Sequence, residues 1–112
     1  MERTTALKKN YEFRRLYTKG KSAATGNIVV YCRRTRQAEN RLGLTVGTKV
    51  GKAVVRNRVR RRLREIYRTN EQRLADGYDV VIVARVRSRD ASYGALESDF
   101  LSLCGRLGIL KQ

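Results

Sequence analysis

The chain has 112 residues, of which 41% are hydrophobic, and a formal net charge of +16 at pH 7. The length suits one domain with a single core, and the apolar content is too high for a disordered basic tail. A charge of this size favours a polyanionic partner, with nucleic acid as the first candidate. Arginine outnumbers lysine by 19 to 7, and the planar guanidinium suits bidentate contacts with phosphate.

The chain has no histidine, and its two cysteines, Cys32 and Cys104, are far apart and lack CxxC spacing. Zinc sites and cysteine–histidine nucleophiles are therefore not expected, and we predict two free thiols that are half-buried beside a sheet. The longest apolar run, VVIVA at 80–84, is far too short to cross a bilayer, and no apolar targeting segment opens the chain. We expect a cytoplasmic protein with no membrane partner.

The first third of the chain predicts a short helix followed by a strand. Residues 10–20, NYEFRRLYTKG, carry a capping asparagine, a helix-ending glycine and an apolar face that includes Phe13 and Tyr17. From Asn27 to Arg33 the residues alternate as in a strand. One face of this strand carries Ile28, Val30 and Cys32, and the other carries Val29, Tyr31 and Arg33.

The remaining residues predict two more strands and two helices. RLGLTVGT at 41–48 resumes the alternation, and ADGYDVVIVARV at 75–86 is apolar at nearly every strand position, as expected of a central strand. Between them, residues 53–74 predict a long helix with a valine and leucine stripe at helical spacing. Residues 92–107 predict a final amphipathic helix that ends at Gly108.

The long helix carries the most unusual stretch, VVRNRVRRRLRE at 54–65, with six arginines between positions 56 and 64. Like charges one helical turn apart cost an isolated helix about 0.2–0.5 kcal/mol per pair, so an anionic partner should offset the repulsion. Gly47 and Gly51 flank Lys49 just before the helix, where small residues let a backbone approach a phosphate closely. From composition alone, a solvated or localisation-type basic helix stays open.

The string KVGKAVVRNRVRRRLRE resembles the signature of the protein subunit of bacterial ribonuclease P, whose hallmark is an R-N-R core followed by further basic residues. LKKNYEFRRLYTKG before it and GYDVVIVARV after it resemble the family's first helix and last strand. The resemblance implies a single ribonuclease P protein domain over residues 1–112, with an α+β, two-layer, ribosomal-protein-like fold. The implied order is α-β-β-β-α-β-α, with a mixed sheet packed by helices and a left-handed β-α-β crossover, whereas most such crossovers are right-handed.

The resemblance also implies a function in tRNA 5′ maturation. The family's protein is an RNA-binding accessory subunit of an endoribonuclease, in which a catalytic RNA subunit removes the 5′ leader from precursor tRNA. The protein then holds no stably bound cofactor, and Mg²⁺ is required by the RNA of the holoenzyme. The expected partners are the RNA subunit and precursor tRNA, and we expect anions such as sulfate or phosphate to bind and stabilise the isolated protein.

Two sets of residues follow from the resemblance by position. The family contacts its RNA subunit through the R-N-R helix and holds the single-stranded leader in a cleft between the first helix and the sheet. Base stacking on aromatic residues beside a positive groove suits such a strand. RNA-subunit binding is assigned to Lys49, Lys52, Arg56, Asn57, Arg58, Arg60, Arg61, Arg64 and Arg68. The leader-binding cleft is assigned to Phe13, Tyr17, Val29, Tyr31 and Arg33, and no catalytic or metal-binding residue is expected.

Less specific interpretations stand beside these assignments. Phe13 and Tyr17 are four residues apart, as in ordinary helix packing, so partial exposure is the observation that would favour a cleft. Asn57 also fits a surface or capping position, Lys49 a solvated turn, and Tyr67 core packing. The family often has serine near Gly47 and phenylalanine where this chain has Tyr17, and a tyrosine ring still stacks.

The same residues bear on three other possible functions. A protein nuclease usually uses histidines or clustered carboxylates, and this chain has no histidine and only scattered acidic residues. A general ribosomal-type RNA-binding protein or RNA chaperone fits the size and charge equally well, and only the motif and the cleft aromatics separate it. Membrane-surface binding is disfavoured because the long helix lacks a bulky face for insertion.

Overall fold

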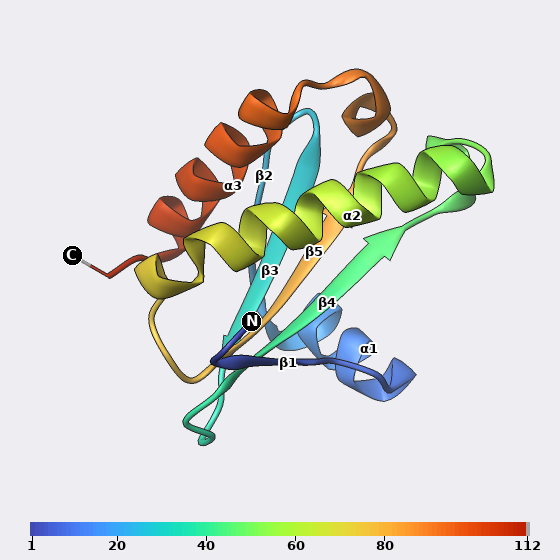
Figure 1. Cartoon of the computed structure of the whole chain (residues 1–112). Helices are drawn as coiled ribbons and strands as arrows, with labels where there is room; N and C mark the ends of the chain where they lie inside the picture. Colours follow the sequence, from blue (N-terminus) through green and yellow to red (C-terminus); the bar gives the residue numbers. More distant parts are fainter. Residues whose placement is uncertain (112) are drawn as a thin grey trace.

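The computed structural model describes residues 1–111 as an α+β fold around one mixed sheet (Figure 1). None of the helices in this range is long and apolar enough to cross a membrane. The strands are β1 (Thr4–Ala6), β2 (Lys21–Ala24), β3 (Ile28–Arg34), β4 (Asn40–Val46) and β5 (Tyr78–Ala84). The helices are α1 (Asn10–Lys19), α2 (Ala53–Asn70) and α3 (Tyr93–Leu107), and the 3₁₀ turns are η1 (Thr48–Val50), η2 (Glu71–Arg73) and η3 (Val86–Asp90).

The five strands lie in the order β1-β4-β5-β3-β2. β4 pairs in parallel with both β1 and β5, whereas β3 pairs antiparallel with β5 and β2. The predicted class and mixed sheet are therefore confirmed, and the structure adds β1 before the predicted first helix. The sequence did not reveal this strand because TTA is too short to show alternation.

The chain passes from β4 to its parallel neighbour β5 through α2. In Figure 1 both strands run towards the upper right, α2 lies in front of the sheet, and β5 lies to the upper left of β4. With the strands pointing upwards and the helix in front, this connection moves to the left, so the crossover is left-handed. The handedness implied by the resemblance is confirmed.

Most of the core lies between the sheet and the two long helices. The inward faces of α2 and α3 bury the apolar residues that their helical spacing predicts, including Val59, Leu63, Leu96 and Phe100. The structure ends α2 at Asn70 rather than at the predicted residue 74, and η2 continues the chain.

Both cysteine thiols lie inside this core and are free. The sequence predicted half-buried thiols, but Cys32 and Cys104 are fully buried, with exposed fractions of only 2% and 0%. Burial raises the pKa of Cys32 and raises that of Cys104 to about 12. Reactive thiolate chemistry is therefore disfavoured at both positions.

The opposite face of the sheet is covered only in part, by α1, which forms a small third layer (Figure 1). A second apolar cluster joins α1 to the sheet through Leu7, Leu16 and Val81. Beside it, Arg41 on β4 bridges two carboxylates. Its Nε and Nη2 atoms donate to Oδ1 and Oδ2 of Asp79 at 2.9 and 2.7 Å, and its Nη1 atom donates to Glu12 on α1.

This ion triplet fixes α1 against β4 and β5. The exposed fraction of the side chain is 23% for Arg41 and 7% for Asp79, so the pair is shielded from water and its hydrogen bonds raise the pKa of Arg41. Burial alone would raise the pKa of Glu12, but the Arg41 guanidinium and the Lys9 backbone N–H outweigh it, and the pKa of Glu12 is lowered. The carboxylate form of Glu12 is therefore the form that the fold stabilises.

Replacing Arg41 with methionine should lower the free energy of unfolding by about 3 kcal/mol, near the low end of the cost of breaking a buried ion pair. Urea unfolding at neutral pH measures this cost. Arg3→Met is the matched control, because Arg3 pairs with Asp76 at the surface and should cost less than about 1 kcal/mol.

The Arg41→Met difference should also shrink on acidification. Stability from a group with a lowered folded-state pKa is present above the unfolded-state pKa and is lost as the pH falls through the folded-state value. A cost that matches that of Arg3→Met, or one unchanged between about pH 7 and about pH 3, would contradict the role given to the triplet.

Candidate nucleic-acid interfaces

The arginines of α2 differ in what their guanidinium groups contact. Arg61 and Arg64 are exposed and have no hydrogen-bond or ion-pair partner within residues 1–111. Arg60 donates from Nη1 to Oδ1 of Asn57 at 2.8 Å, and Arg56 donates from Nε to the Gly51 carbonyl at 3.2 Å. The turn before α2 and the R-N-R core are thus tied together, while two neighbouring guanidiniums stay available to an anion.

The other flank of α2 is hydrogen-bonded to η3 and the residue after it. Arg58 donates from Nη2 to the Arg89 carbonyl, and Arg62 donates from Nη1 to the Ala91 carbonyl, each at 3.2 Å. These bonds join the R-N-R helix to a second basic segment that carries Arg85 and Arg87. This segment was not predicted from the sequence, although VARVRSRD places three arginines at alternate positions directly after the core strand.

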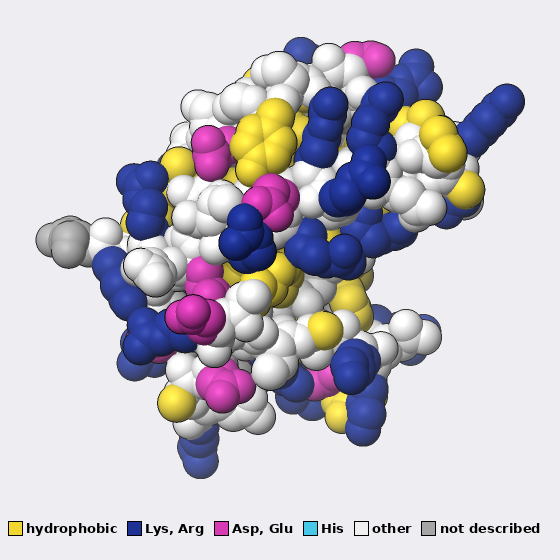
Figure 2. Space-filling view, in the orientation of Figure 1, with side chains coloured by type: hydrophobic (Ala, Val, Ile, Leu, Met, Phe, Trp, Pro, Cys, Tyr) yellow, Lys and Arg dark blue, Asp and Glu magenta, His cyan; other side chains and the backbone are white. Residues whose placement is uncertain are grey.

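The other residues assigned to RNA-subunit binding lie at the two ends of α2. Lys49 in η1 and Lys52 at the N-cap of α2 are both exposed. Arg68 near the C-terminal end pairs with Glu65 on the preceding turn, and this hydrogen bond raises the pKa of Arg68. Figure 2 shows Lys and Arg side chains gathered over the N-terminal half of α2, with most acidic side chains of that view towards its C-terminal end.

All nine assigned residues therefore lie on one helix and the turn before it. We call this set the α2 basic surface: Lys49, Lys52, Arg56, Asn57, Arg58, Arg60, Arg61, Arg64 and Arg68.

The cleft residues lie across the sheet from α2, on the face that α1 covers in part. Pairing between β3, β5 and β4 aligns Val29 with Val83 and Val83 with Thr45. Tyr17 of α1 borders this row. Its hydroxyl lies 2.8 Å from the Thr45 hydroxyl, and its ring packs edge-on against the Tyr31 ring, with 4.9 Å between the ring centroids. We call these five residues the aromatic shelf.

The shelf is accessible. The exposed fraction of Tyr17 is 39%, whereas Tyr31, Val29, Val83 and Thr45 are half-buried. A groove of about 450 Å³ runs beside Tyr17 and includes Arg14 of α1. A second groove of about 510 Å³ extends from Thr45 and Val83 to Lys49 and Arg85.

Phe13 has two roles in the geometry. Its ring lies directly over Gly43 of β4, where an added Cβ would stand 2.5 Å from Phe13 Cε1. Phe13 packs against the second apolar cluster, and it also lines the groove beside Tyr17. Its packing role, raised as the less specific interpretation, is therefore present together with its exposure to the groove.

Arg33 lies at one end of the cleft residues on β3. It shares the face of β3 that carries Val29 and Tyr31, and it is two residues from Tyr31 and four residues, or about 13 Å along a strand, from Val29. Arg33 lines a different hollow with Lys19 and Lys21. Four residues at or beside the shelf were not predicted from the sequence: Thr45, Val83, Arg14 and Arg85. They come together only when the strands pair and α1 packs on the sheet.

The side chains of the two surfaces suit RNA binding. Among residues 1–111, no group of three or more His, Cys, Asp or Glu side chains is placed to hold a metal ion. The shelf offers ring edges and apolar surface beside guanidinium and ammonium groups, which suits stacked bases with a phosphate backbone. The α2 basic surface offers charge in a fixed helical array, which suits a folded polyanion.

The chain is similar to known proteins over nearly its whole length. The family model for ribonuclease P matches residues 1–108. The ribonuclease P protein component of Natranaerobius thermophilus is 40% identical over 112 residues, covering 100% of this chain and 97% of that protein. The ribonuclease P protein component of Clostridioides difficile is 42% identical over 108 residues, covering 96% of this chain and 95% of that protein.

Solved structures show the same fold. The ribonuclease P protein of Staphylococcus aureus superposes with a TM-score of 0.86 at 28% identity, covering 95% of this chain and 97% of that one. The ribonuclease P protein of Thermotoga maritima superposes with a TM-score of 0.82 at 30% identity, covering 90% of this chain and 96% of that one. From its sequence and its fold alike, the chain belongs to the ribonuclease P protein family.

Proposed function

We propose that the chain acts in the cytosol by holding two RNAs at once: the RNA subunit on the α2 basic surface and the single-stranded 5′ leader of precursor tRNA on the aromatic shelf. Membership of the family makes it the accessory protein component of an endoribonuclease that matures tRNA 5′ ends. In this proposal the RNA subunit, with Mg²⁺, cleaves the phosphodiester bond. The protein supplies affinity and position.

The observation that carries the proposal is the separation of the two surfaces by the sheet. α2 covers one face, and the shelf lies on the other face beside α1 (Figure 1). Neither surface blocks the other, so a leader strand and a folded RNA can be bound together. The two surfaces also differ in chemistry, since one is almost wholly cationic and the other combines aromatic and apolar groups.

Electrostatics supports the first half of the proposal. Arg61 and Arg64 have no acidic partner within residues 1–111, so phosphates are the natural counter-charge for a chain of net charge +16. Counterions released from the RNA then add to affinity. The same guanidiniums are expected to bind sulfate or phosphate when the protein is alone.

Stacking supports the second half. The Tyr17 ring is exposed beside α1, and the half-buried Tyr31 ring packs edge-on against it. Each base stacked on an aromatic side chain contributes about 1–3 kcal/mol. Such contacts tolerate any base, which fits a leader of variable sequence.

Removal of one free guanidinium should weaken binding of the RNA subunit and flatten its salt dependence. Arg61→Ala should reduce the slope of log K against log salt by about 1, because one fewer counterion is released. Filter binding over a series of salt concentrations measures the slope. Arg36→Ala is the control, since Arg36 is exposed in the turn between β3 and β4. Equal slopes for Arg61→Ala and the unmutated protein would show that Arg61 does not meet phosphate.

Loss of the Tyr17 ring should weaken binding of precursor tRNA by about tenfold and leave mature tRNA, which has no leader, unaffected. Tyr17→Phe keeps the ring and removes only the hydrogen bond to Thr45, so it should bind nearly as well as the unmutated protein. Affinities are compared in the complex with the RNA subunit. Equal losses for precursor and mature tRNA in Tyr17→Ala would contradict leader binding at the shelf.

A further inference from the structure

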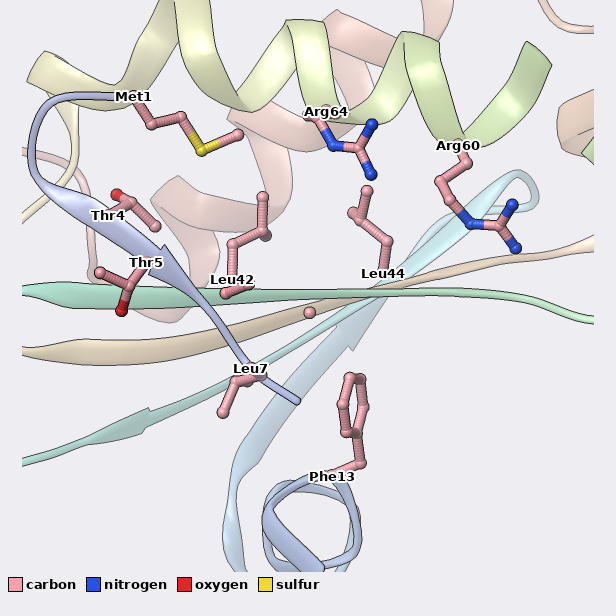
Figure 3. A pocket seen from close by; sticks show the side chains of 11 residues that line it. Met1, Thr4, Thr5, Leu7, Phe13, Leu42, Leu44, Arg60 and Arg64 are labelled. Carbon is pink, nitrogen blue, oxygen red and sulfur yellow. The ribbon is translucent and has the colours of Figure 1, made fainter. Parts of the chain in front are cut away.

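A pocket of about 500 Å³ lies between β1, β4, α1 and α2, and it shares Phe13 and Leu44 with the groove beside Tyr17. Figure 3 shows Leu42 and Leu44 rising from β4 towards α2, and Arg60 and Arg64 reaching from α2 into the same space. Phe13 approaches from α1 on the other side of β4. The volume is in the range typical of small-ligand sites.

The lining of the pocket has the charge pattern of an anion site. Two guanidiniums stand one helical turn apart at its α2 wall, and none of its lining residues is acidic. Within residues 1–111, Arg64 has no hydrogen-bond or ion-pair partner, and Arg60 forms a single side-chain hydrogen bond, to Asn57. The apolar floor beneath them would hold a flat or hydrophobic body, while the guanidiniums would hold an attached phosphate.

The pocket also contains an open strand edge. β1 pairs with β4 only as far as Ala6 opposite Leu42, and the last bond of the ladder runs from the Leu7 N–H to the Leu42 carbonyl at 2.9 Å. In a parallel ladder the next bond would join the Leu44 N–H to the Leu7 carbonyl, and no such bond forms in the part of the chain described, residues 1–111. Since Leu44 is two residues after Leu42, its N–H and C=O both point to this open side.

We propose that this pocket binds one nucleotide. The base lies at the open edge of β4, with Leu42 and Leu44 on its α2 side and Phe13 on its other side. Its polar edge forms hydrogen bonds with the backbone N–H and C=O of Leu44, and its phosphate lies between Arg60 and Arg64. The N–H and C=O of one strand residue lie on the same side of the strand, so they offer one donor and one acceptor side by side, which matches the edge of a nucleobase.

An unpaired nucleotide of an RNA bound on α2 is the natural source, because Arg60 and Arg64 belong to the α2 basic surface. This source rests on the proposed function. The nucleotide chemistry of the pocket does not, since a free nucleoside monophosphate offers the same base and phosphate.

The first test uses adenosine 5′-monophosphate, inorganic phosphate and adenosine as probes of the isolated full chain, followed by amide NMR. The monophosphate should shift the Leu44 and Ala6 amide signals and bind at least about tenfold more tightly than either phosphate or adenosine, because only it fills both halves of the pocket. If the monophosphate moved the same signals as phosphate and left Leu44 unchanged, the pocket would be an anion site only and the proposal would be wrong.

The second test fills the pocket without removing charge. Ala6 shares with Thr4 the face of β1 that looks towards α2, so Ala6→Trp should occupy the space and weaken monophosphate binding by about tenfold or more. Ala24→Trp is the matched control, because Ala24 is also exposed on an edge strand, β2, at the far end of the sheet. Equal affinities for the two variants would overturn the proposal.

The same variants identify the source of the nucleotide. If Ala6→Trp weakens binding of the RNA subunit several-fold and Ala24→Trp does not, the nucleotide belongs to the RNA. If only monophosphate binding suffers, the pocket serves a free nucleotide. If the unmutated protein failed to bind the RNA subunit at all, the proposed function would fail, and the monophosphate titration would still decide the pocket.

Discussion

The parallel pairing of β4 with β5 positions the α2 basic surface, the aromatic shelf and the ion triplet at Arg41. Its register sets Arg41 opposite Asp79, Gly43 opposite Val81 and Thr45 opposite Val83. The first pair anchors α1, and the glycine makes room for the Phe13 ring. The third pair extends the shelf towards β3. Because β4 and β5 run the same way, the chain must also cross the sheet between them, and that crossover is α2 with its arginines.

The distribution of charge follows from the same frame. Two of the ten acidic side chains, Glu12 and Asp79, pair with Arg41. Burial and the bidentate geometry with Asp79 strengthen this interaction. Another, Glu65, pairs with Arg68 on the exposed side of α2. Little negative charge is left to neutralise the middle of α2. Among residues 1–111, the fold therefore leaves Arg61 and Arg64 without an acidic partner where the RNA subunit is proposed to bind, and it uses two carboxylates to fix α1.

Sequence patterns predicted the parts of this structure that depend on local spacing. Alternation put Val29 and Tyr31 on the same face of β3, and helical periodicity separated the buried residues of α2, such as Leu63, from its arginines. β1 was missed because three residues carry no period, and the left hand of the crossover came only from the resemblance, since local physics favours the opposite hand. The family assignment also removes the ribosomal-type alternative, which composition had left open.

The parts that the sequence could not supply depend on contacts between distant segments. Nothing local indicates that Arg58 turns to η3 while Arg64 faces β1, or that Thr45 of β4 meets Tyr17 of α1. Alternation gave the face of β3 that carries Arg33, whereas the hollow that Arg33 lines with Lys19 depends on the position of α1.

The most direct measurement is cleavage of a precursor tRNA that carries a 5′ leader, at low magnesium, with three samples: the protein alone, a bacterial ribonuclease P RNA alone, and both together. The account predicts efficient cleavage at the mature 5′ end only in the mixture, because the RNA supplies the chemistry and the protein supplies grip on the leader and the RNA. Cleavage by the protein alone, or a mixture no more active than the RNA by itself, would contradict it.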